Sequence, residues 1–206
     1  MKVFFYHDGL TLLPGTSMDW QYLTLHTALR APATLDYERV LALIGAWHVD
    51  GAVPYKGWHI VNYGYSSAGI ILMGSHDYVG LHHIDGHPAT IYNRRKPLDG
   101  TTGDRVRDAF RRALELARLL EGQSVYPGLA VDPGRWFLAA NDALRVPNTD
   151  AAVADLRGPL EEILRPLFGA GAWTITRRPA GQRFGVDITV RQAPAVAELE
   201  ARLGKG

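Results

Sequence analysis

The stretch QYLTLH, residues 21–26, indicates a β-strand, and the segments around it indicate that the chain has an α/β fold. A helix is predicted over residues 34–48, because Thr34 is a suitable N-cap and apolar side chains recur behind it at helical spacing. Residues 57–62 and 70–73 are then predicted as the two strands of a hairpin. We expect these elements to form a central mixed β-sheet that is flanked by helices.

The middle of the chain alternates predicted loops with a second helix. Residues 80–88 (GLHHIDGHP) are rich in glycine and histidine and are predicted as a loop. Thr101 and Asp104 match a capping box in front of a helix that runs to Leu120. Residues 122–136 contain two Pro-Gly pairs and are predicted to be irregular.

The last part of the chain is predicted to form a separate small unit. A break near Pro147 divides the chain into an α/β domain, residues 1–147, and a C-terminal α+β unit, residues 148–206. The unit has the pattern helix, strand, strand, helix, and Pro159 and Pro166 are expected to shorten or kink its first helix. No catalytic grouping occurs in the unit, and a role in forming a homodimer is one expectation for it.

Composition and charge exclude several classes of function. The chain has 206 residues and no cysteine, so disulfides are excluded and any metal must be held by His, Asp or Glu. Its 22 Lys and Arg nearly balance 21 Asp and Glu, so no overall charge favours nucleic acid or an anionic membrane. No window is apolar enough for a transmembrane helix, and residues 1–10 make a poor signal peptide. We therefore expect a cytoplasmic protein with no nucleic-acid or membrane partner.

The histidines are distributed unevenly and point to a site in the first domain. All 8 histidines lie at or before position 87, and histidine is the commonest metal ligand and the side chain that titrates nearest neutral pH. His26 ends a predicted strand, from which a side chain can project rigidly into a cleft. Three further histidines share one glycine-bounded loop and can converge on one point; they are His82, His83 and His87. We therefore place the functional chemistry in the N-terminal part of the chain rather than in its tail.

Several short motifs occur in the same order as in a known family. They are LTLHTAL with His26, IGAWHVD, KGWHIV with Trp58 and His59, GLHHIDGHP, and VDPGRWF with Asp132. In this order they resemble the type-2 N-acetylmuramoyl-L-alanine amidases, which share a fold with the peptidoglycan recognition proteins. The resemblance covers residues 20–138, and the family's second zinc-binding histidine has no counterpart before Asp132.

The resemblance implies a zinc hydrolase that acts on the bacterial cell wall. Such an enzyme holds zinc with three protein ligands and leaves one position for a water molecule, whose pKa the metal lowers. The implied zinc ligands are His26, His82 and Asp132. The residues implied to bind substrate are Trp58, His59, His83 and His87. The implied reaction is cleavage of the amide between N-acetylmuramic acid and L-alanine in peptidoglycan or a muropeptide. Without a signal peptide, such an enzyme is a cytoplasmic muropeptide recycler or a phage lysin released through holes in the membrane.

Three other interpretations stay open. A chain that lacks one zinc ligand is expected to bind peptidoglycan without cleaving it. His82 or His83 beside Asp77 or Asp85 would form an oriented His–carboxylate pair for acid–base catalysis without metal. The 5 Trp and 9 Tyr also fit a phage or bacterial structural protein that contacts its partners through aromatic side chains.

Overall fold

The structure is a computed structural model, and it describes residues 18–30, 35–50, 57–63, 69–121, 123, 125–179 and 183–204. Its elements, in chain order, are β1 (Leu23–Leu29), α1 (Tyr37–Asp50), β2 (His59–Tyr63), β3 (Gly69–Met73), β4 (Asp77–Ile84), β5 (His87–Arg94), α2 (Thr102–Glu121), β6 (Val131–Ala140), α3 (Asp150–Phe168), β7 (Trp173–Arg177), β8 (Gly185–Val190) and α4 (Val196–Leu203). The α/β class predicted from the sequence is confirmed.

The strands form one 8-stranded sheet in the order β2-β3-β4-β5-β1-β6-β8-β7. Every neighbouring pair in this order is antiparallel, so the prediction of a mixed sheet is wrong. The order from β2 to β5 contributes to the difference, because strands that are consecutive in the chain, adjacent in the sheet and separated by only a few residues run in opposite directions. Strand β1 lies in the middle of the sheet, between β5 and β6.

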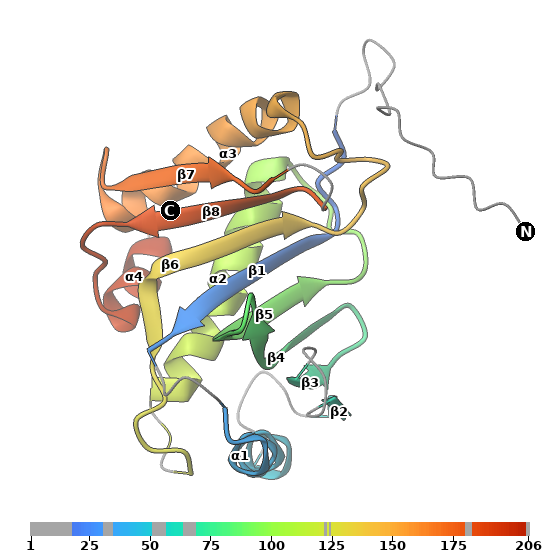
Figure 1. Cartoon of the computed structure of the whole chain (residues 1–206), viewed down its shortest axis with the longest axis vertical. Helices are drawn as coiled ribbons and strands as arrows, with labels where there is room; N and C mark the ends of the chain where they lie inside the picture. Colours follow the sequence, from blue (N-terminus) through green and yellow to red (C-terminus); the bar gives the residue numbers. More distant parts are fainter. Residues whose placement is uncertain are drawn as a thin grey trace, which may run out of the picture.

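All four helices of the described part of the chain lie on one face of the sheet (Figure 1). Side chains of a strand alternate between the two faces, and in β1 the residues Leu23, Leu25 and Leu29 join the helices in one core. Helix α2 contacts β1, β5 and β6 as well as α3 and α4, whereas α1 covers β2 and β3. We call the opposite face, on which Thr24 and His26 lie, the open face.

The helix starts follow the local sequence. Thr101 and Asp104 form the predicted capping box: the Asp104 carboxylate accepts from the Thr101 amide at 2.8 Å, and the Thr101 hydroxyl accepts from the Asp104 amide at 3.2 Å. In α1 the first amides are satisfied by Asp36, whose carboxylate accepts from the amides of Glu38 and Arg39. The predicted cap at Thr34 lies outside the described residues.

Two segments predicted as loops are strands. Residues 80–88 lie in β4 and β5, which pair closely and are joined by a two-residue turn at Asp85 and Gly86. Both turn residues have positive φ, 51° and 79°, as a tight Asp-Gly hairpin requires. Strand β6 begins at Val131, inside the segment predicted to be irregular, because its pairing with β1 and β8 outweighs the local Pro-Gly signal.

The C-terminal elements occur in the predicted order, but they extend the main sheet. Strand β8 pairs with β6, and α3 and α4 pack on α2 in the same core cluster as β1. Helix α3 also runs without a break through Pro159 and Pro166, so the expected shortening is wrong. Burial of its apolar side chains, among them Leu160 and Leu164, compensates for the main-chain hydrogen bonds that the prolines remove.

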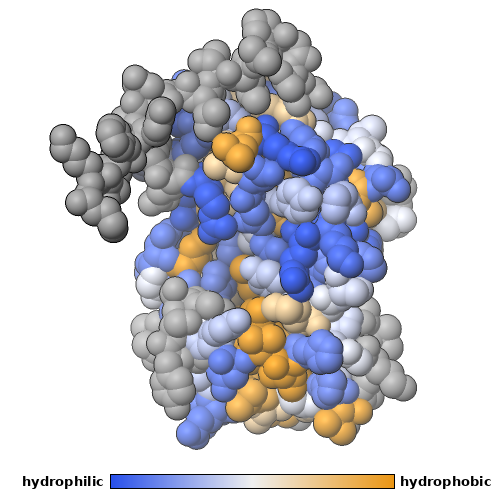
Figure 2. Space-filling model, turned by 90° about the vertical axis from the view of Figure 1, so that its right-hand side faces the viewer, coloured by the Kyte–Doolittle hydropathy of each residue, from blue (hydrophilic) through white to orange (hydrophobic). Residues whose placement is uncertain are grey.

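The surface is mostly hydrophilic on the side shown in Figure 2, and hydrophobic side chains gather there toward the end of the molecule at which α1 lies. Helix α1 carries two exposed apolar side chains, Leu41 and Val49. None of the helices in the described part of the chain combines the length and the apolar character that a membrane crossing needs.

A chain that ends at residue 147 is expected not to fold cooperatively. It would lose β8, α3 and α4, and so expose buried side chains of α2 and β6 such as Leu116 and Leu138. Thermal unfolding followed by circular dichroism should show no sharp transition for this chain, in contrast to the full-length protein. A well-dispersed amide NMR spectrum from the truncated chain would instead establish residues 1–147 as an independent domain.

Candidate functional site

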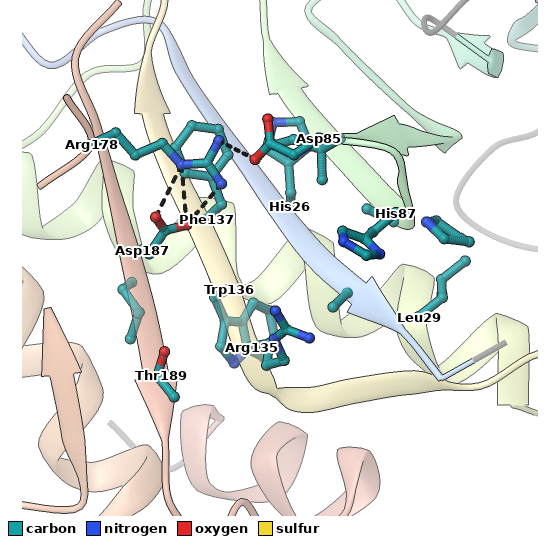
Figure 3. A pocket seen from close by; sticks show the side chains of 15 residues that line it. His26, Leu29, Asp85, His87, Arg135, Trp136, Phe137, Arg178, Asp187 and Thr189 are labelled. Atoms are coloured by element: carbon teal, nitrogen blue, oxygen red, sulfur yellow. Dashed lines mark hydrogen bonds and ion pairs between the residues drawn. The ribbon is translucent and has the colours of Figure 1, made fainter. Parts of the chain in front are cut away.

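The open face carries a groove that consists of two adjoining hollows. The first has a volume of about 500 Å³, and the second has a volume of about 590 Å³. Both share His26, Asp85, Phe137 and Arg178 as lining residues, so they meet over the middle of the sheet. Each volume is in the range that holds a small ligand. Figure 3 shows the first hollow with these side chains around it.

Two buried histidines meet at the floor of the groove. His26 of β1 and His82 of β4 reach toward each other across β5, and the distance from His26 Nδ1 to His82 Nε2 is 2.8 Å. Since the bond needs one donor and one acceptor, the two rings share a proton in one of two tautomeric arrangements. Burial holds the pKa of His26 well below its usual value, and the nearby His82, Arg178 and Arg183 lower it further. His26 is therefore neutral at pH 7.

A row of planar groups continues from the histidine pair across the sheet. Phe137 of β6 lies opposite His26 in the strand register, and their rings stack with centroids 5.2 Å apart. The guanidinium carbon of Arg178 lies 3.6 Å from the centroid of the Phe137 ring. Gly185 of β8 makes room for this ring, because a Cβ there would come within 2.5 Å of it. The row thus fixes the orientation of Arg178, which follows the edge strand β7.

Arg178 is held by two carboxylates. Its Nε and Nη2 donate to Asp187 of β8, with the shortest distance 2.8 Å. Its Nη1 lies 2.8 Å from Asp85, in the turn between β4 and β5. Figure 3 shows both contacts. Two more arginines line the groove, Arg135 in the first hollow and Arg183 in the second. Neither has a carboxylate within ion-pair distance among the residues that the structure describes.

The second hollow has a wall of amides and hydroxyls. The Thr24 hydroxyl accepts from the side-chain amides of Asn93, at 2.5 Å, and Asn141, at 2.7 Å. Arg183 donates to the Asn141 carbonyl oxygen at 3.1 Å. Tyr78 lies nearby, and burial raises the pKa of its phenol. This wall offers hydrogen bonds to an uncharged part of a ligand.

The structure brings together two of the three predicted zinc ligands. His26 and His82 are adjacent, whereas Asp132 lies five residues along β6 from Phe137, the residue opposite His26. That separation corresponds to about 16 Å along a strand. The Asp132 carboxylate instead accepts from the Gly134 amide at 3.0 Å. In the described part of the chain, no three His, Asp or Glu side chains are grouped so that they could hold a metal ion.

Two of the other predicted site residues line the groove and two lie away from it. His87 lines the first hollow, and His83 lines the second, where its Nδ1 lies 2.8 Å from the Tyr37 hydroxyl of α1. Trp58 and His59 lie at the β2 edge of the sheet, where the Trp58 ring packs against Gly74. Among the carboxylates considered as partners for a histidine, Asp85 lines both hollows. Asp77 is buried beside Arg94 and Arg112 at the start of β4.

Sequence reasoning missed the contribution of the tail to the groove. Arg178, Arg183 and Asp187 all follow residue 148, in the segment in which no catalytic grouping was predicted. One signal was present: the strand GVDITV alternates apolar and polar side chains, which predicts that Asp187 and Thr189 share the face directed away from the core. The identity of the partner of Asp187, Arg178, depends on the pairing of β7 with β8.

Comparison of the chain with protein-family models, with curated proteins and with solved structures finds no match.

The stability of the protein is expected to fall as the pH drops below 6.5, the ordinary pKa of histidine. Because the pKa of folded His26 is lowered, protons bind preferentially to the unfolded chain in this window, and the folded state loses up to about 1.4 kcal/mol per pH unit. Urea unfolding at pH 7.5 and 5.5 measures how steeply the free energy of unfolding changes with pH. This pH dependence should decrease in His26→Asn but not in His59→Asn, which changes an exposed histidine. The same pH dependence of stability in wild type and both variants would contradict the claim that His26 causes it.

Proposed function

We propose that the protein binds a small polar ligand with an anionic group in the groove of the open face. The observation that carries this proposal is the set of three arginines along the groove, Arg135, Arg178 and Arg183. Guanidinium groups bind carboxylates and phosphates through paired hydrogen bonds, and two of these three have no carboxylate partner in the described part of the chain.

The rest of the groove supports an anionic ligand. The three arginines outweigh the two aspartates, Asp85 and Asp187, so the groove attracts negative charge. His26 is buried and neutral, and it adds hydrogen-bonding capacity without a charge that would need compensation. The stack of His26, Phe137 and Arg178 keeps the cationic group in place before the ligand arrives, which lowers the entropic cost of binding.

A peptidoglycan fragment belongs to this class of ligand, because it carries carboxylates and amides on one polar chain. The peptidoglycan or muropeptide partner predicted from the sequence is therefore one candidate occupant of the groove. Under this proposal the protein recognises such a molecule without cleaving it.

Replacing Arg178 should weaken anion binding. Arg178→Met removes a charged donor, and the loss of its hydrogen bonds should raise the dissociation constant about ten-fold or more. The measurement is a titration of wild type and variant with inorganic phosphate and with glutarate, followed by amide NMR shifts of residues in the groove. The matched control is Arg157→Met. Arg157 is an exposed arginine of α3 that pairs with Glu161, and α3 lies on the face of the sheet opposite the groove. Equal affinities for wild type and Arg178→Met would refute the proposal.

We propose a zinc-dependent hydrolase as a second candidate function, because the His26 and His82 nitrogens lie 2.8 Å apart. To bind one tetrahedral zinc ion, the two nitrogens would move apart to about 3.3 Å and exchange their mutual hydrogen bond for the metal, and a third protein ligand would complete a catalytic site. The sequence prediction of an amidase that cleaves the N-acetylmuramoyl-L-alanine bond depends on that third ligand.

Elemental analysis of purified protein tests this second function. A zinc site at the histidine pair should give about one zinc per chain in the wild type and in His59→Ala, and none in His26→Ala. Cleavage of a muropeptide would then be assayed on the zinc-loaded protein. Absence of zinc from wild type after incubation with excess metal would exclude the zinc hydrolase and leave the ligand-binding function.

A further inference from the structure

The ion pair between Arg178 and Asp85 crosses the open face. Asp85 lies in the turn between β4 and β5, whereas Arg178 follows β7 at the far edge of the sheet, and β1, β6 and β8 lie between that hairpin and β7. Arg178 rests over the Phe137 ring at this crossing. Since both residues line both hollows, the ion pair lies where the hollows meet. Figure 3 shows the ion pair among the residues of the first hollow.

The two contacts of Arg178 differ in how firmly they hold it. Asp187 belongs to a strand paired on both sides, and it engages Nε and Nη2 of the guanidinium together. Such a two-armed contact fixes the plane of the group. Among the residues that the structure describes, the Nη1 atom forms an ion pair with Asp85 only. The guanidinium can therefore keep its position on Asp187 and Phe137 while Nη1 changes its partner.

Asp85 can leave its ion pair with Arg178 at little cost in stability. Its side chain is 67% exposed, and exposed ion pairs contribute little to stability. It also occupies a turn position with φ of 51°, in which the hairpin geometry, rather than the ion pair, holds the main chain. Release of Asp85 from Arg178 therefore leaves the sheet unchanged.

We propose that Asp85 occupies an anion subsite of the groove, and that the ligand is an elongated molecule whose single carboxylate replaces Asp85 on Arg178. This proposal rests on the proposed binding function and names the class of ligand. The carboxylate binds at the crossing, and one polar arm extends into each hollow. Thr189 is available to the arm in the first hollow, and Asn93 is available to the arm in the second.

The charges at the crossing favour a carboxylate over a phosphate dianion. After Asp85 leaves, Asp187 stays on Arg178 with its side chain 43% exposed. Beside Arg178 itself, a monoanion restores the charge that Asp85 provided, since Arg135 and Arg183 each line one of the two hollows rather than the crossing. A dianion adds a second negative charge beside Asp187, and like charges at this range repel.

The test compares wild type with Asp85→Asn, which removes the competing charge and keeps a residue that tolerates positive φ. The probe is the blocked tripeptide acetyl-Ala-Glu-Ala-amide, whose carboxylate lies between two polar arms; the uncharged probe is acetyl-Ala-Gln-Ala-amide. Binding is followed by the Arg178 Nε–H signal in NMR titrations. The glutamyl probe should bind Asp85→Asn about five-fold more tightly than wild type, corresponding to about 1 kcal/mol.

Two controls make the outcome specific. Asp150→Asn also neutralises an exposed aspartate paired with an arginine, Arg177, and should leave the affinity for the glutamyl probe unchanged. The glutaminyl probe should bind both proteins equally weakly, and inorganic phosphate should gain less than the glutamyl probe from Asp85→Asn.

The outcomes separate the two proposals. Equal affinity of the glutamyl probe for wild type and Asp85→Asn would overturn the replacement of Asp85, while anion binding at the Arg178 signal would leave the binding function standing. A gain for phosphate as large as that for the glutamyl probe would overturn the carboxylate preference. If neither anion shifted the Arg178 signal in either protein, both proposals would fail.

Discussion

The packing of α2 against the middle of the sheet is the constraint on which the rest of the structure depends. Its buried face contacts β1, β5 and β6 on one side and α3 and α4 on the other, so segments from both halves of the chain share one core. Because the helices gather on this face, the polar residues of the same strands are directed to the opposite face. Leu25 and His26 are neighbours in sequence, yet one belongs to the core and the other to the groove.

The antiparallel order of strands gives the open face its chemical character. It places β4 and β8 on either side of β1, so His82 approaches His26 from one side and the pair of Arg178 and Asp187 approaches from the other. Burial removes the charge from His26, whereas the carboxylates of Asp187 and Asp85 preserve the charge of the partly buried Arg178. As a result, the floor of the groove at His26 is neutral, and the guanidinium of Arg178 above it is charged.

Local sequence signals predicted those elements that are stabilised by near neighbours. The capping box at Thr101 and Asp104 marked the start of α2, and the order helix, strand, strand, helix held for the tail. The prediction failed where pairing between distant segments decides the structure. Residues 80–88 contain loop-forming residues but lie in two paired strands, and Pro133 lies inside β6. For the site, the sequence singled out His26 and His82 but not Arg178.

The sequence by itself determined the α/β class, the absence of thiol chemistry and the concentration of histidines before residue 88, because these depend on composition and short-range periodicity. Only the tertiary structure decided that the C-terminal strands join the same sheet and that Arg178 lies over Phe137 and meets Asp85. It also separated Asp132 from His26. The reason is that strand order and register are set by burial of a shared core, and residues far apart in the chain meet only after that choice is made.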